Sequence, residues 1–138
     1  MSLNPKQIAR LGIPSLLTVL AFFTLTHFQE GLNAHGWKAP KEAADKKNPM
    51  VRSKSSINSG RILYIEHCAG CHGKEVDGLG PDGTYLETKP PDLRKRAENH
   101  SDGDFFWKIQ HGKGDMPSFG KNLQDRKIWD IINYLRSL

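Results

Sequence analysis

Between residues 55 and 72, the larger side chains recur at the spacing of an α-helix. They follow the polar pair Ser55-Ser56, and polar residues separate them. The recurring positions are Leu63, Tyr64, His67 and Cys71. This pattern predicts an amphipathic helix whose end holds both cysteines of the chain, Cys68 and Cys71.

Two more helices are predicted in the second half of the chain. Ser101 and Asp104 precede the run FFWKI and match a capping box, so we expect a short helix to about Gln110 that stops at Gly112. From Asp125 onward one apolar stripe predicts a closing C-terminal helix. The stripe consists of Ile128, Ile131, Ile132 and Leu135.

The segment between residues 73 and 92 has the composition of a loop. It contains four glycines and three prolines, which favour turns. No convincing alternation of apolar and polar residues predicts a strand anywhere in the chain. The expected fold class is therefore all-α, with three or more helices in the main domain.

The N-terminal segment is different in kind. Lys6 and Arg10 precede Leu11–Phe28, an apolar run without aspartate, glutamate, lysine or arginine. A soluble helix would show a polar face, so this run indicates an export signal or a membrane-anchoring helix. The alternative is cleavage after Ala34, where Leu32-Asn33-Ala34 is an imperfect match to a signal-peptidase site.

Composition divides the chain into three parts. We expect residues 1–34 to be the signal-anchor or signal peptide. Residues 35–56 contain prolines and many charges without an apolar period, which is typical of a linker or an extended arm. The remaining residues, 57–138, form the main domain.

The net charge restricts the possible partners. It is +5 for the chain, and residues 35–138 carry 18 basic and 14 acidic side chains. This mild excess suits docking on an acidic protein surface, and it is too small for a nucleic-acid-binding protein. The lysines nearest the cysteines and Met116 are candidates for such docking; they are Lys74, Lys113 and Lys121.

The two cysteines carry the most specific signal. Cys68-Ala69-Gly70-Cys71-His72 is the C-x-x-C-H pattern of covalent haem attachment. Two thiols one helical turn apart can add to the two vinyl groups of one porphyrin, and the imidazole of His72 then reaches the iron. A small domain with few large apolar residues also needs such a covalently held group to complete its core.

Three other chemistries share part of this pattern. A thioredoxin-like pair would follow a strand in a βαβ unit. A zinc site would need further ligands from scattered histidines. A structural disulfide would close a loop too short to stabilise the fold much.

Residues 57–138 resemble a small bacterial-type cytochrome c of the single-haem, His/Met-ligated class. The resemblance rests on C-x-x-C-H after a helix, on Gly114-Asp115-Met116-Pro117-Ser118-Phe119, and on a final amphipathic helix. It implies a cytochrome c-like helical domain around one covalently bound haem c. It also implies that Gly60 and Tyr64 cross the last helix at Ile131 and Tyr134. The N-terminal hydrophobic helix predicted from the apolar run precedes this domain and lies outside the resemblance.

Carried over from this resemblance, Met116 is the second axial ligand of the iron, opposite His72. The other methionines, Met1 and Met50, lie in the signal and the linker. Two alternatives remain: Met116 fills a gap in the core, or His111 is the sixth ligand. Histidine and methionine together leave no position open for a substrate.

Two further residues are implied by the resemblance. The carbonyl of Pro91 would accept the outer N–H of His72 and tune its basicity, the alternative being an ordinary turn proline. Trp107 would lie beside a haem propionate, the alternative being a plain core aromatic.

The resemblance implies an electron carrier rather than an enzyme, without a small-molecule substrate. The donor would be a quinol-oxidising complex or a dehydrogenase, and the acceptor an oxidase or another reductase. In this family haem is attached on the outer side of the membrane, so the haem domain should face the periplasm from the bacterial inner membrane. It would be a soluble periplasmic protein if the chain is cleaved near Ala34.

Two alternative functions stay open. The chain could be a fixed cytochrome subunit of a larger respiratory complex, or a haem enzyme or gas sensor with a labile sixth ligand.

Overall fold

The computed structural model describes residues 36–138, and the predicted apolar segment Leu11–Phe28 lies outside this range. Within the described range, none of the helices combines the length and apolar character that a membrane crossing requires. The main compact unit runs from Lys38 to Leu138.

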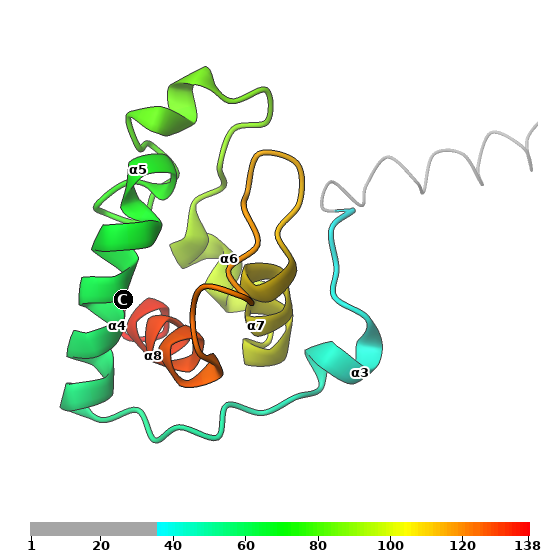
Figure 1. Ribbon diagram of the computed structural model, residues 1–138, viewed down its shortest axis with the longest axis vertical. Coiled ribbons are helices and arrows are strands. Elements are labelled where there is room, and N and C mark those ends of the chain that lie inside the picture. Colours follow the sequence, from blue (N-terminus) through cyan, green and yellow to red (C-terminus); the bar gives the residue numbers. More distant parts are fainter. Residues whose placement is uncertain (1–35) are drawn as a thin grey trace, which may run out of the picture. The chain divides into compact units, whose positions relative to one another are not determined.

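This unit is built from helices, as the sequence predicts (Figure 1). One 3₁₀ helix, η1, lies between α5 and α6. The elements are α3 (Lys41–Ala44), α4 (Lys54–His67), α5 (Ala69–His72), η1 (Asp82–Tyr85), α6 (Leu93–Asn99), α7 (Asp102–His111) and α8 (Asp125–Leu135).

Helix α4 is shorter than the sequence pattern predicts. Ser53 caps its N-terminus, with its hydroxyl accepting a hydrogen bond from the backbone N–H of Ser56 at 3.1 Å. At Cys68 the backbone leaves helical geometry, with φ −122° and ψ −33°. The predicted continuous helix is therefore broken, and the single turn α5 carries Cys71 in a new direction.

Helices α4 and α8 cross at close range and form the centre of the core. A Cβ atom on Gly60 would overlap the backbone carbonyl of Asp130, so only glycine allows this approach. One turn further, the rings of Tyr64 and Tyr134 pack with centroids 5.4 Å apart. The Tyr64 hydroxyl then donates a hydrogen bond of 2.7 Å to the carbonyl of Gly73, which ties the crossing to the end of α5.

Helix α7 begins and ends as predicted, but only the Ser101 half of the capping box forms. The Asp104 carboxylate instead binds Ala39, His100 and Lys108. The Ser101 hydroxyl accepts a hydrogen bond from the N–H of Asp104 at 3.2 Å, and the helix ends before Gly112, which has φ +64°. The ring of Phe106 stacks on that of Trp129 from α8 at 4.0 Å. The apolar stripe of α8 is buried, as predicted.

From Lys38 onward, the segment expected to be a linker or arm packs along α7 and α8 (Figure 1). Its backbone N–H at Ala39 donates to the Asp104 carboxylate at 2.8 Å. The Lys46 ammonium lies 4.4 Å from the centre of the Phe106 ring, and Asn48 donates to Asn133 at 2.9 Å. The arm is thus held by specific side chains of the helical domain.

Asp104 is the charged centre of this contact. Its carboxylate is buried and lies 2.7 Å from the Lys108 ammonium and 2.6 Å from Nδ1 of His100. Burial alone would raise the pKa of Asp104. Hydrogen bonds from Lys108 and Ala39, together with the two cationic neighbours, outweigh burial and hold this pKa below its usual value.

We therefore expect Asp104→Asn to lower the free energy of unfolding by roughly 2–3 kcal/mol near neutral pH. Because the folded pKa is depressed, the carboxylate stabilises the fold fully above its unfolded pKa of about 3.9, and this contribution is lost as pH falls through the lower folded pKa. Urea unfolding across acidic pH measures the difference. Glu98→Gln, at an exposed position, is the control. A difference that persists unchanged at about pH 2 would contradict the assignment.

Candidate functional site

Cys68 directly precedes the single turn α5, and Cys71 lies within it. The N–H of Cys71 donates to the carbonyl of Cys68 at 3.2 Å, and the N–H of His72 donates to the same carbonyl at 2.9 Å. Both thiols are free and half-buried. Two sulfur atoms and an imidazole are thus fixed within one turn of backbone, as the spacing of the motif predicts.

The two thiols differ in their surroundings. Burial, with a smaller effect of Cys71, raises the pKa of Cys68 to about 12. The pKa of Cys71 is also raised, by burial and then by the nearby carboxylates of Asp82 and Asp115. Cys68 therefore faces the interior, whereas Cys71 lies close to charged side chains.

His72 is held in the form that binds iron. Burial lowers the pKa of its imidazole, and the backbone of Pro91 opposes this effect only in part. The ring is therefore neutral, with a lone pair available. Its Nδ1 is buried and, among residues 36–138, is the one buried side-chain nitrogen or oxygen without a hydrogen bond of ordinary geometry.

Pro91 comes near His72 because the chain folds back tightly after α5. Gly78 has φ +84°, and a Cβ atom there would collide with the backbone of Pro90 and Pro91. The N–H of Gly78 donates to the carbonyl of His72 at 2.8 Å, so one glycine joins the two segments. In the sequence Gly78 is one of four glycines in a predicted loop, and only the backbone geometry reveals that it joins these two segments.

Met116 stands in a tight turn between α7 and α8. Lys113 and Met116 exchange two backbone hydrogen bonds, of 2.9 and 3.1 Å, and Gly114 between them has φ +57°. The Met116 side chain is half-buried and packs against the core. Gly114 and Pro117 thus fix the backbone on either side of Met116, and this holds the thioether at one place. A methionine in an open loop would lack this constraint.

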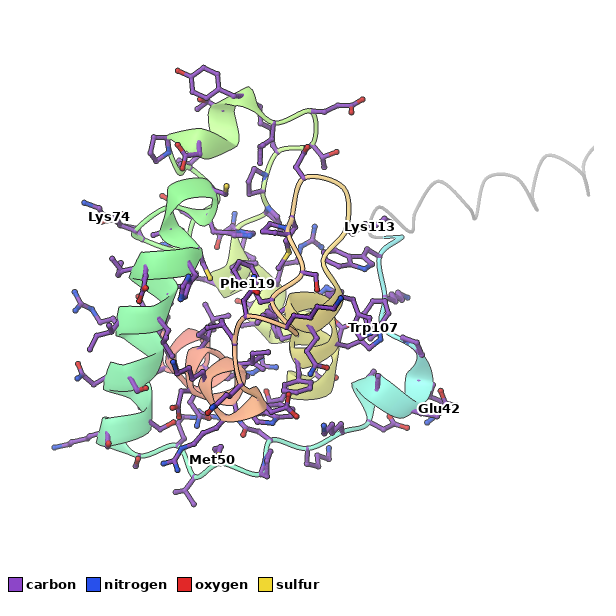
Figure 2. The ribbon with its side chains drawn as sticks, in the orientation of Figure 1. Glu42, Met50, Lys74, Trp107, Lys113 and Phe119 are labelled. Carbon is purple, nitrogen blue, oxygen red and sulfur yellow. The ribbon has the colours of Figure 1, made fainter. Side chains whose placement is uncertain are left out.

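The Met116 turn and the cysteine motif approach each other. Asp115, next to Met116, is close enough to Cys71 to raise its pKa. Phe119, on the far side of the turn, has its ring 6.0 Å from that of His67 at the end of α4 (Figure 2). Two segments more than forty residues apart in the chain therefore meet at one site.

Trp107 and His111 lie together on α7. Their rings stack at 4.4 Å, and Nδ1 of His111 is 2.8 Å from the carbonyl oxygen of Trp107. Trp107 is half-buried, whereas His111 is exposed. The ring of His111, the alternative sixth ligand, is thus engaged with Trp107.

The donor groups fit a covalently bound haem. Two thiols one turn apart match two vinyl groups, and a neutral imidazole and a thioether are the axial ligands typical of cytochromes c. The buried Nδ1 of His72, beside the backbone of Pro91, is the nitrogen that fixes the ring of such a ligand.

Comparison with known proteins agrees with this chemistry. Residues 55–135 match the family described as cytochrome c oxidase, cbb3-type, subunit III. Cytochrome c6 of Porphyra purpurea is 30% identical over 88 residues, which cover 64% of this chain and 76% of the relative. Cytochrome c6 of Synechococcus elongatus is 27% identical over 85 residues, covering 59% and 88%.

Among solved structures, a chain of the reducing HAO-like protein complex of Kuenenia stuttgartiensis is similar in fold. It aligns with a TM-score of 0.58 and 28% identity over 64% of this chain. The present chain spans 46% of that larger chain. With the C-x-x-C-H turn and the family match over most of the helical domain, the chain belongs to the cytochrome c family, whose members transfer electrons through covalently bound haem c.

Proposed function

We propose that residues 57–138 form a single-haem electron carrier in which Cys68 and Cys71 bind the porphyrin and His72 and Met116 are the axial ligands. The observation that carries this assignment is the contact between the rings of Phe119 and His67, 6.0 Å apart, which brings the Met116 segment to the attachment motif. The haem supplies a reversible one-electron centre.

The surrounding residues prepare the site for this role. The neutral ring of His72 offers a lone pair, and the backbone of Pro91 lies beside it, where the Pro91 carbonyl would accept the outer N–H of the ring in the haem-bound protein. The closed turn from Lys113 to Met116 presents the thioether, which together with the imidazole would leave no position for a substrate. Trp107 would donate its indole N–H to a haem propionate, and His111 supports its ring by stacking.

The carrier acts at the periplasmic face of the inner membrane. Leu11–Phe28 is long and apolar enough in sequence to serve as its anchor, and residues 1–34 form the signal-anchor. Extracytoplasmic location is typical of the cytochrome c family. Electrons arrive from a quinol-oxidising complex or a dehydrogenase and leave to an oxidase or another reductase.

A fixed subunit of a respiratory complex is the second candidate. The matched family is described as a subunit of an oxidase, which favours this role. Purification in mild detergent followed by mass measurement distinguishes the two. A free carrier elutes at the mass of one chain with its detergent, whereas a subunit elutes with partner chains.

Intact mass of the protein from the membrane fraction tests the haem assignment. We expect the wild-type chain to exceed its polypeptide mass by one haem, and the double variant Cys68→Ser with Cys71→Ser to lose both this mass and the absorption band of the haem. His67→Gln, in the same segment, should keep both. A colourless wild-type protein at polypeptide mass, made in a host competent for haem attachment, would reject the proposal.

A further inference from the structure

The segment between α5 and α6 has a charge opposite to that of the whole chain. Although the net charge of the protein is +5, residues 73–92 carry five acidic side chains and only two lysines. The acidic residues are Glu75, Asp77, Asp82, Glu87 and Asp92, and the lysines are Lys74 and Lys89.

Part of this acidic segment packs directly on the attachment turn. The N–H of Gly80 donates to the carbonyl of Cys71 at 3.2 Å, and a Cβ atom on Gly83 would lie 2.6 Å from the same oxygen. Helix η1 therefore covers α5 (Figure 1). The Asp82 carboxylate lies against Gly70, between the two cysteines in the sequence.

A second carboxylate comes from the Met116 turn. The Asp82 carboxylate lies against Gly70, where a Cβ atom would collide with its oxygen. Asp115 belongs to the Met116 segment, whose Phe119 ring lies 6.0 Å from that of His67 beside the attachment motif. Both carboxylates are exposed, and neither forms an ion pair within the described residues 36–138. Their negative charge is therefore not neutralised by a neighbouring side chain.

Two large apolar side chains of the same segment as Asp82 are exposed. Leu79 is 80% exposed and Tyr85 is 90% exposed, whereas most large apolar residues of the domain are buried. Residues three apart share one side of a 3₁₀ helix, so Tyr85 lies on the same side of η1 as Asp82. We call Leu79, Asp82, Tyr85 and Asp115 the Cys71 face.

We propose that the Cys71 face is the docking surface for a redox partner that presents lysine or arginine side chains around an apolar centre. This inference rests on the proposed function, because the face lies over the residues that would hold the haem. An exposed apolar pair supplies contact area, and the two carboxylates attract a basic partner and repel an acidic one.

The exposed Lys74 and Lys113 favour the opposite choice, an acidic partner. They do not determine the local charge, because the Asp82 carboxylate lies against Gly70 within the attachment motif and residues 73–92 carry five acidic side chains against two lysines. The net charge of the whole chain acts on a partner over long distances. At those distances salt screens the electrostatic interaction strongly.

Charged redox reagents test this choice on the holoprotein. In the reaction with tris(phenanthroline)cobalt(III), one electron leaves the reduced haem and converts cobalt(III) to cobalt(II). We expect the rate with this cation to fall as salt is added, and to fall roughly threefold in Asp82→Asn and in Asp115→Asn at low salt. The rate with anionic ferricyanide should rise in both variants.

Glu42→Gln is the matched control, since this exposed carboxylate lies on α3, far from the loops that carry the Cys71 face (Figure 2). It should leave both rates unchanged. Rates that are insensitive to Asp82→Asn and Asp115→Asn, or that change in the opposite directions, would overturn the proposal. A normal haem spectrum in the same samples shows that such a result rejects the docking face and not the haem site.

A binding measurement gives an independent readout. The redox-inert cation tris(ethylenediamine)chromium(III) is paramagnetic and should broaden the amide resonances of residues 79–85 and of Asp115 in the reduced protein. The hexacyanochromate(III) anion should leave these resonances sharp. Broadening by the anion at these positions, and none by the cation, would reject a basic partner.

Discussion

Replacing Met116 by alanine is expected to lower the midpoint potential of the haem by on the order of 0.2 V and to allow rapid binding of carbon monoxide to the reduced protein. The closed turn from Lys113 to Met116 holds the thioether half-buried. The other methionines, Met1 and Met50, are more than sixty residues away in the sequence, so neither is a neighbour that could replace it. Potentiometric titration and carbon monoxide difference spectra measure the two effects.

Two controls make this prediction specific. Met50→Ala removes the other methionine that packs on the core, and it should change neither the potential nor carbon monoxide binding. His111→Gln removes the alternative ligand, whose ring stacks on Trp107, and should bind no carbon monoxide. If His111→Gln gains this binding and Met116→Ala does not, histidine rather than methionine is the sixth ligand.

The same comparison separates an electron carrier from a gas-binding protein. A carrier with both axial positions filled should bind carbon monoxide only after Met116 is removed. Rapid binding by the wild-type protein would instead indicate a labile sixth position, and would favour the haem enzyme or gas sensor considered from the sequence.

Local signals in the sequence predicted α7 and α8. Helix α7 begins at the Ser101 cap and ends before Gly112. Helix α8 has no side-chain cap at Gln124 and was predicted from its apolar stripe alone. A cap and an apolar spacing can both be recognised within a few residues of sequence. The family resemblance could be predicted because C-x-x-C-H is a local motif, and the family match over residues 55–135 confirms it.

Features that depend on distant contacts were not predicted. The break at Cys68 separates α4 from α5, although the apolar spacing continues across it. Helix α6 was missed because Leu93–Asn99 is mainly polar, and its start at the Asp92 cap lies directly after two prolines. The approach of Asp115 to Cys71 joins loops from different parts of the chain, and no spacing rule reports it.

The arm shows the same limit. Its charges and prolines are typical of a linker, yet Ala39 and Lys46 find partners in Asp104 and Phe106 on α7. Composition indicates whether a segment is soluble and flexible by itself. It does not show whether a buried carboxylate or an aromatic ring elsewhere in the chain lies where the segment can bind it.

The largest loss of stability is expected from Gly60→Ala. A Cβ atom at this position would overlap the carbonyl of Asp130 and lie 2.9 Å from the backbone nitrogen of Ile131. Backbone atoms cannot move aside as a flexible side chain can, so α4 and α8 must separate. We expect the free energy of unfolding of the holoprotein to fall by about 3 kcal/mol, measured by urea unfolding.

The intrinsic helix propensity of alanine acts in the opposite direction, which makes this substitution a decisive test of the crossing. In a helix that packs loosely, Gly→Ala stabilises by roughly 1 kcal/mol. Asn58→Ala, at an exposed position of the same helix, is the control and should leave stability unchanged or raise it by about 0.5 kcal/mol. A more stable Gly60→Ala protein would mean that α4 and α8 do not meet at Gly60. The close crossing of α4 and α8 would then be rejected. With it would go the explanation of how Tyr64, through its hydrogen bond to the carbonyl of Gly73, positions the haem-binding turn.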